Sequence, residues 1–202
     1  FQPSELVKIA FVLVGAATLD RLFAKRNLIF TILFSAYCVG CLALMSDFGT
    51  ALIFFVAFLC IAFLRTGDLP SIVMVSAAAA IACGIILHFK PYIAQRFAAW
   101  RHTLGAANTD LVFGVVGEAF GLLIALCCVA AVVVLVLFTL RQAAAARSSF
   151  YTIASCAAVA MLVTQVMLNV LGAVDILPLT GVTFPFLSVG GSSMAACWGL
   201  LA

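Results

Sequence analysis

The sequence predicts an all-α protein, a bundle of about seven helices that cross a lipid bilayer. Hydrophobic residues make up 67% of the 202 positions and charged residues only 8%, whereas soluble domains carry about 25% charged residues. A chain of this composition cannot cover a water-facing surface, so it belongs in a membrane. Its apolar runs are long and lack the period-two alternation of membrane strands, which favours helices.

Seven apolar segments account for most of the chain, because a spanning helix needs about 20 residues. In order, they are Ser4–Leu19, Leu28–Met45, Phe48–Leu64, Leu69–Phe89, Asp110–Leu140, Ser149–Gly172 and Pro185–Ala202. The fifth segment is the longest and can cross the bilayer with a tilt. No soluble domain is visible between the segments, so residues 1–202 are predicted to form a single transmembrane domain. Because an apolar run is already under way at Phe1, we expect a fragment.

The charged residues between these segments predict the orientation of the chain. Lysine and arginine gather in the loops that follow the first, third and fifth segments: Arg21, Lys25, Arg26, Arg65, Arg141 and Arg147. These loops share one side of the membrane, which is cytoplasmic by the positive-inside rule. The extracytoplasmic side then receives the Ser46–Asp47 turn, the 90–109 loop and the 173–184 loop.

Cations in the 90–109 loop break this pattern, because Lys90, Arg96 and Arg101 lie on the extracytoplasmic side. Either they are exceptions that the rule tolerates, or they bind an anion. Arginine suits phosphate oxygens because its planar fork contacts two of them at once, and a lipid-linked diphosphate is the obvious anion on this face. Binding to nucleic acid is excluded, since the chain has no basic stripe.

Charged residues inside the predicted spans are costly and often functional. Glu5 and Lys8 are three residues apart and therefore share one helical face. They either form an ion pair that satisfies both charges, or they form the polar wall of a substrate groove. Glu118 lies within the fifth segment and is expected to face the interior of the bundle, where it can orient a partner as readily as take part in chemistry.

Two aspartates stand at predicted membrane boundaries. Asp47, in SDFGTA, fits the N-cap of the third segment. Asp110, in NTDLVFGVVGE, could also be a cap, although Asn108 and Thr109 can serve that purpose. Because cations precede it in the chain, Asp110 is also placed to act as a general base, which must reach the proton that it takes.

An irregular stretch, DILPLTGVTFPFLSVGGSS, leads into the last segment. Its notable residues are two helix-breaking prolines, two glycines that allow close backbone approach and two serines that can bond backbone or an anion: Pro178, Pro185, Gly190, Gly191, Ser192 and Ser193. It is no P-loop, because the lysine is missing. Non-helical backbone is permitted at membrane depth where it lines a cavity.

Four motifs together carry a resemblance to a known family: FQPSELVKIA, SDFGTA, NTDLVFGVVGE and LPLTGVTFPFLSVGGSS. In this order they are similar to the signatures of the SEDS family, whose members include FtsW, RodA and SpoVE. The resemblance implies a ten-helix bundle in the bacterial cytoplasmic membrane, of which this chain would be the C-terminal two-thirds.

The same resemblance implies a glycosyltransferase that polymerises peptidoglycan glycan strands for cell division, elongation or sporulation. Its substrate would be lipid II, a disaccharide-pentapeptide on undecaprenyl diphosphate. Its partner, besides membrane lipids, would be a class B penicillin-binding protein, a transpeptidase that crosslinks the strands.

The resemblance also assigns chemistry. Asp110 matches the family's essential aspartate and would deprotonate the 4-hydroxyl of the acceptor sugar on the extracytoplasmic side. Taken with the charges described above, the residues expected to bind substrate are Glu5, Lys8, Lys90, Arg96, Arg101, Glu118, Ser192 and Ser193, with Asp47, Gly190 and Gly191 supporting the site. Cations near the diphosphate would stabilise the leaving group as charge develops. A divalent cation, Mg²⁺ or Mn²⁺, could assist there, although no cluster of metal ligands in the sequence demands one.

Three departures from the family pattern leave two other functions open. Three front helices have no counterpart here, the second acid of the family's GEE is Ala119, and RFAAWRHTLGAANTD replaces a longer loop. A transporter that moves lipid II across the membrane would suit Glu5, Lys8 and Glu118 equally well. The short loop and Ala119 favour a non-catalytic scaffold for a penicillin-binding protein.

Overall fold

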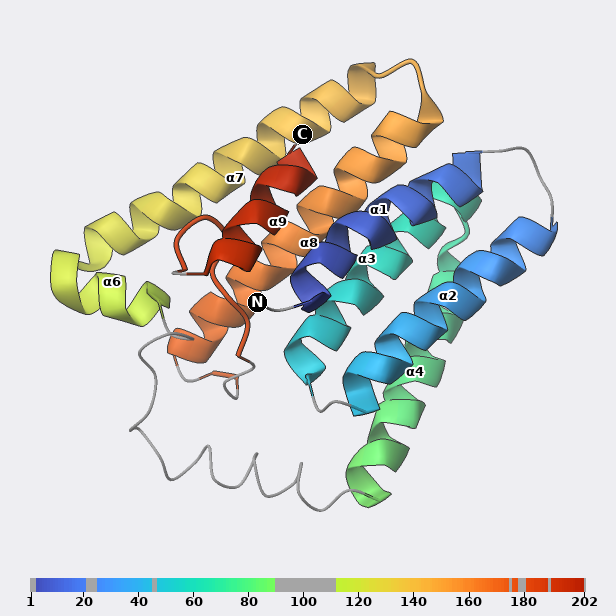
Figure 1. Ribbon diagram of the computed structural model, residues 1–202, viewed down its shortest axis with the longest axis horizontal. Helices are drawn as coiled ribbons and strands as arrows, with labels where there is room; N and C mark the ends of the chain where they lie inside the picture. Colours follow the sequence, from blue (N-terminus) through green and yellow to red (C-terminus); the bar gives the residue numbers. More distant parts are fainter. Residues whose placement is uncertain are drawn as a thin grey trace.

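The computed structural model describes residues 3–20, 25–44, 47–89, 112–174, 176–177, 181–188 and 190–201. Within these residues the chain forms helices and no strand, which confirms the predicted all-α fold. The helices, labelled in Figure 1, are α1 (Pro3–Asp20), α2 (Lys25–Leu44), α3 (Phe48–Thr66), α4 (Leu69–Phe89), α6 (Val112–Phe120), α7 (Leu122–Ala145), α8 (Ser149–Ala173) and α9 (Gly191–Leu201).

Helix α8 is the centre of the bundle, because it packs against α1, α3, α6, α7 and α9. One stripe of its side chains, Ile153, Ala157, Met161 and Leu168, belongs to the main apolar core. That core joins α8 to Phe11 of α1 and to Phe54 of α3, whose rings meet edge to face with centroids 5.0 Å apart. Such interlocking packing is a main source of helix association in a bilayer.

Glycines on α1 and α9 let helices approach closely. A Cβ atom at Gly15 would lie 2.8 Å from Ile61 Cδ1 of α3, and one at Gly199 would lie 2.5 Å from Ile9 Cδ1 of α1. A larger residue at either position would require the end of the isoleucine side chain to move, whereas glycine leaves room for it. The close approach at Gly199 seats α9 directly against α1.

The fifth predicted segment is not one helix, which corrects the expectation of a continuous span over Asp110–Leu140. The chain breaks at Gly121, whose φ of 89° favours glycine, and α6 folds back beside α7 (Figure 1). The fold packs Phe113 of α6 into a second apolar cluster with Val132 of α7 and Val166 of α8. The run of apolar residues had hidden this change of direction.

The last predicted segment also needs correction, since α9 begins at Gly191 rather than at Pro185. Residues 185–187 form a turn in which Phe186 takes a φ of 62°, a left-handed conformation incompatible with a continuing helix. Non-helical chain therefore extends to the edge of α9, as the prolines had indicated.

Three helices of the described part are long and apolar enough to cross a membrane: Phe48–Thr66, Leu122–Ala145 and Ser149–Ala173, with mean hydropathies of 2.3, 3.2 and 1.9. Helices α1, α2 and α4 coincide with predicted segments but do not meet that standard within the described residues. The protein is therefore a helical membrane protein, although the predicted number of about seven spans exceeds these three.

Candidate functional site

A buried ion pair on α1 is the most polar feature inside the described bundle. Lys8 Nζ lies 2.7 Å from Glu5 Oε1, and the two side chains are only 2% and 4% exposed. The predicted sharing of one helical face is thus confirmed, and the pair satisfies the lysine charge. Removing two charges from water costs free energy, and charged residues inside a membrane bundle often belong to a functional site.

The glutamate of this pair is only half satisfied. Glu5 Oε2 and the neighbouring Ser4 Oγ are buried and have no hydrogen-bond partner among the described residues. A buried carboxylate oxygen without a partner is costly. A donor group that reached it would satisfy it, but the oxygen is closed off from solvent in this structure.

Helix α9 packs against α1, the helix that carries this pair, and Gly199 of α9 lies against Ile9, the neighbour of Lys8. Cys197 of α9 is buried. Ser193, one turn earlier, is buried, and Ser192 is half-buried. The structure thus brings the motif around Glu5 and Lys8 next to the motif that ends in Ser192 and Ser193.

The segment before α9 is fixed by its own hydrogen bonds. The Phe184 N–H donates to Ser188 Oγ at 2.7 Å, and the Ser188 N–H donates to Phe184 O at 3.2 Å. The Gly190 carbonyl then accepts the first helical bond of α9, from Met194 N–H at 2.9 Å. The close approach expected at Gly191 is not seen among the described residues, where a Cβ atom would meet open space.

The polar elements meet at one end of the bundle. Figure 1 shows the starts of α1, α3, α6 and α9 and the end of α8 at that end. Lys8 lies five residues into α1, about 8 Å along the axis. Loop charges predict that this end faces the extracytoplasmic side.

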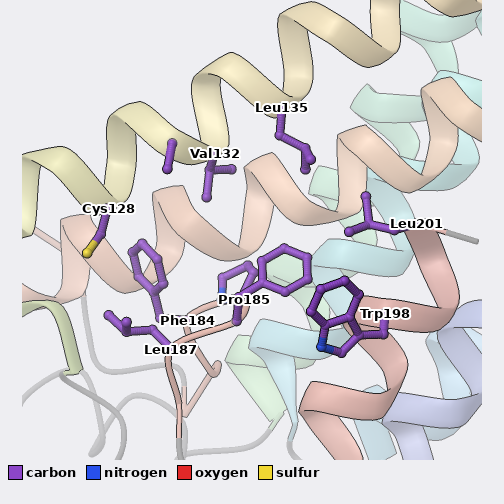
Figure 2. A pocket seen from close by; sticks show the side chains of 10 residues that line it. Cys128, Val132, Leu135, Phe184, Pro185, Leu187, Trp198 and Leu201 are labelled. Atoms are coloured by element: carbon purple, nitrogen blue, oxygen red, sulfur yellow. The ribbon is translucent and has the colours of Figure 1, made fainter.

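An apolar groove lies beside the polar cluster, between α7 and α9 (Figure 2). It has a volume of about 390 Å³ and is walled by Cys128, Val132 and Leu135 of α7 and by Trp198 of α9. The Trp198 ring meets that of Phe186 edge to face, with centroids 5.8 Å apart. The groove can hold hydrocarbon but supplies no ligand for an anion.

Asp47 behaves as a cap, as predicted. Its Oδ1 accepts from the Thr50 N–H at 3.2 Å, and α3 ends at Gly67 in a left-handed conformation with a φ of 62°. Asp47 therefore supports the end of α3 that lies beside α1.

Glu118 does not face the interior of the bundle, and that prediction is wrong. Its side chain is exposed, whereas Phe113 and Val116 of the same helix pack inward. Two residues turn an α-helix by about 200°, so a helix that buries Val116 points Glu118 away. The chain breaks at Gly121 and α6 folds back. Helix α6 therefore packs against the bundle with a different face from the one that an unbroken helix over this segment would use.

Several predicted site residues lie outside the described residues: Asp110, Lys90, Arg96 and Arg101. Their roles stay predictions. Within the described part, no group of three or more histidine, cysteine, aspartate or glutamate side chains could hold a metal ion.

Two buried amides of α8 were missed from the sequence. Asn169 is 2% exposed and Gln165 is 1% exposed, in the helix that forms the core. Asn169 bonds to Phe113 and Val182, whereas neither amide atom of Gln165 has a partner in the described structure. The rule that singled out Glu5 and Lys8, that polar groups inside spans are costly, would have found both.

Comparison with known proteins identifies the family of this chain. The model of the FtsW, RodA and SpoVE family, described as a cell cycle protein, matches residues 1–104 and 101–202, and so covers the whole chain. The chain belongs to the FtsW/RodA/SpoVE family. This confirms the SEDS resemblance that rested on four motifs.

Individual relatives in the FtsW/RodA/SpoVE family agree. A probable peptidoglycan glycosyltransferase FtsW of Borreliella burgdorferi is 26% identical over 247 residues, covering 98% of this chain and 66% of that protein. A probable peptidoglycan glycosyltransferase FtsW of Lactococcus lactis is 40% identical over 90 residues, covering 45% of this chain and 21% of that protein. The chain spans less than two thirds of the length of either relative.

A solved structure shares the fold. It comes from a peptidoglycan synthase complex described as coordinating polymerization and crosslinking, with a TM-score of 0.81 and 25% identity over 100% of this chain and 68% of that chain. The two parts of the FtsW/RodA/SpoVE match overlap at residues 101–104, within the predicted 90–109 loop.

Proposed function

We propose that the protein containing this chain is a peptidoglycan glycosyltransferase that polymerises glycan strands from lipid II at the outer face of the bacterial cytoplasmic membrane. The observation that carries the proposal is the buried Glu5–Lys8 pair on α1, which packs against α9, in a chain of the FtsW/RodA/SpoVE family. Relatives of this family are named for the same activity.

In this mechanism Asp110 takes the proton from the 4-hydroxyl of the acceptor sugar. The resulting oxygen attacks the anomeric carbon of the donor, the bond from that carbon to the diphosphate breaks, and the lipid diphosphate leaves. Lys90, Arg96 and Arg101 stabilise the charge on the leaving group, and arginine does so with paired donors. Ser192 and Ser193 supply hydroxyl donors at the edge of the same site.

A substrate donor that reached the free oxygen of Glu5 would satisfy it, while Lys8 holds the other oxygen in place. A divalent cation would neutralise diphosphate charge when bound. The Lys8 ammonium 2.7 Å from Glu5 disfavours a second cation on that carboxylate. Glu118, exposed on α6, would meet substrate only from the outside of the bundle.

A class B penicillin-binding protein is the proposed partner, supported by the match to a complex that couples polymerization with crosslinking. The second candidate function is a non-catalytic scaffold for such a partner. The short stretch before Asp110 favours it, as does Ala119, which stands where the family has a second acid.

Polymerisation of purified lipid II by the reconstituted full-length protein tests the proposal, with native protein compared with Asp110→Asn. The substitution keeps the size of the side chain and removes the base, so we expect strand synthesis to fall by at least about a hundredfold. The protein is assayed with its penicillin-binding partner present.

Each alternative predicts a different pattern in that assay. Equal synthesis by both proteins would show that Asp110 is only a cap. Absence of synthesis by both would favour the scaffold, and the partner's crosslinking would then be unchanged by Asp110→Asn. Movement of lipid II across vesicles by Asp110→Asn at the native rate, without synthesis by either protein, would favour a transporter.

A further inference from the structure

Asn169 makes two hydrogen bonds to described residues outside its own helix. Its Oδ1 accepts from the Phe113 N–H of α6 at 3.4 Å, and its Nδ2 donates to the Val182 carbonyl at 3.0 Å. The oxygen can only accept and the nitrogen can only donate, so the two bonds together fix the orientation of the amide. One buried side chain of α8 thereby connects two segments that are far apart in the sequence.

The first bond fixes where α6 begins. Phe113 is the second residue of α6, and the first four N–H groups of a helix have no partner within it. Asn169 satisfies one of these groups from outside, as a cap would. The chain reaches from Phe113 back to Asp110 through three residues, a span of at most about 11 Å. The start of α6 therefore limits where Asp110 can lie.

The second bond fixes the segment that leads to α9. Val182 is buried and precedes the Phe184–Ser188 turn, which continues into the start of α9. Helix α9, in which Ser193 and Cys197 are buried, packs against α1, the helix of the Glu5–Lys8 pair. Asn169 therefore connects the start of α6 to the segment that leads to α9.

Apolar packing alone would not set this position. Phe113 and Phe184 share an apolar cluster with Val166 of α8, but burial of apolar surface is not directional. Loss of the Asn169 amide would leave the Phe113 N–H and the Val182 carbonyl without these partners. A buried donor or acceptor without a partner is energetically costly. The two segments would then shift until water or other groups satisfied them.

We propose that Asn169 is a positioning residue for glycosyl transfer, which holds Phe113 at the start of α6, three residues after Asp110 in the chain, in a fixed position relative to the segment at Val182. The proposal rests on the proposed function of Asp110. Asn169 acts through α6 and does not touch the reacting atoms. A misplacement of about 1 Å can cost a hundredfold in rate, so its loss should lower kcat more than it changes KM.

The test compares Asn169→Leu, Asn169→Asp and Thr164→Val with native full-length protein. Leucine has a similar volume and neither polar atom. A buried aspartate favours its protonated form, which offers one acceptor and one donor as asparagine does. Thr164 is the matched control on the same helix, because among the described residues its hydroxyl bonds to the Ala160 carbonyl of α8, at 2.7 Å, and to no other helix.

We expect Asn169→Leu to lower kcat for lipid II polymerisation by about 10- to 100-fold with KM within about threefold of native. Asn169→Asp should recover part of this loss, and Thr164→Val should match native protein. Backbone hydrogen exchange of Asn169→Leu should rise in residues 112–116 and 182–188 but not in residues 149–164. This measurement does not require activity, so it can also be made on an inactive variant.

The inference is overturned if Asn169→Leu keeps native kcat, or if exchange in residues 112–116 and 182–188 stays at the native level. Failure of the proposed function looks different, since Asp110→Asn would then polymerise as native protein does. A loss with Asp110→Asn and none with Asn169→Leu rejects the positioning role alone.

Discussion

At the scale of the residue, three buried polar side chains of the described bundle differ in what they bond to. Lys8 bonds to Glu5 within α1, Asn169 bonds to two other segments, and Gln165 has no partner for either amide atom. A polar group inside a membrane bundle is stabilising only when its bonds are made. The consequences of substitution should therefore differ among the three.

Lys8→Met should destabilise the protein, because it leaves Glu5 as an uncompensated buried charge. We expect the free energy of unfolding to fall by about 3–5 kcal/mol, measured by denaturant-induced unfolding in detergent micelles. The double variant Lys8→Met with Glu5→Gln serves as the control and should recover most of the loss, since it removes both charges. A single variant as stable as native protein would contradict a buried ion pair.

At the scale of the element, helix positions were predictable and directions were not. Apolar run length placed α1, α2, α3, α4 and α8 to within a few residues, because a span must match the bilayer. Run length also predicted α6 and α7 as one helix, because hydropathy carries no information about a glycine at positive φ. The partners of Asn169 lie far away in sequence, so a local pattern could show that the residue is unusual but not what it binds.

Gly121→Ala should destabilise the turn between α6 and α7. A φ of 89° with a ψ of 154° is accessible almost only to glycine, so alanine there should cost about 1–3 kcal/mol. Gly117→Ala is the matched control, because Gly117 is helical and its Cβ would lie 4.0 Å from Ala125 Cβ, in ordinary contact. That change should stabilise by up to about 1 kcal/mol through helix propensity.

Thermal unfolding of the two glycine variants tests whether the helix is broken at Gly121. A broken helix predicts that Gly121→Ala lowers Tm and that Gly117→Ala raises it. A single continuous helix over residues 112–145 would instead raise Tm in both variants, and that result would reject the fold-back of α6.

At the scale of the whole molecule, large apolar side chains lie on the surface and charged side chains lie inside, the reverse of the arrangement in a soluble protein. Leu123, Val134 and Phe138 of α7 are exposed, whereas Glu5 and Lys8 are buried. An exposed apolar face is stable against lipid, and buried charges at one end of the bundle are stable where they pair or line a polar site. The orientation of that end in the membrane then decides which side the substrate must occupy.

Reporter fusions test this orientation. The loops after α3 and α7 carry Arg65, Arg141 and Arg147, which the positive-inside rule places in the cytoplasm. Alkaline phosphatase fused after Gly67 or Ala146 should be inactive, and fused after Gly181 it should be active, because it folds only outside the cytoplasm. A fluorescent protein at the same sites should give the reverse pattern. Active phosphatase at Gly67 would place the Glu5–Lys8 end in the cytoplasm, where a site for exported strands cannot lie.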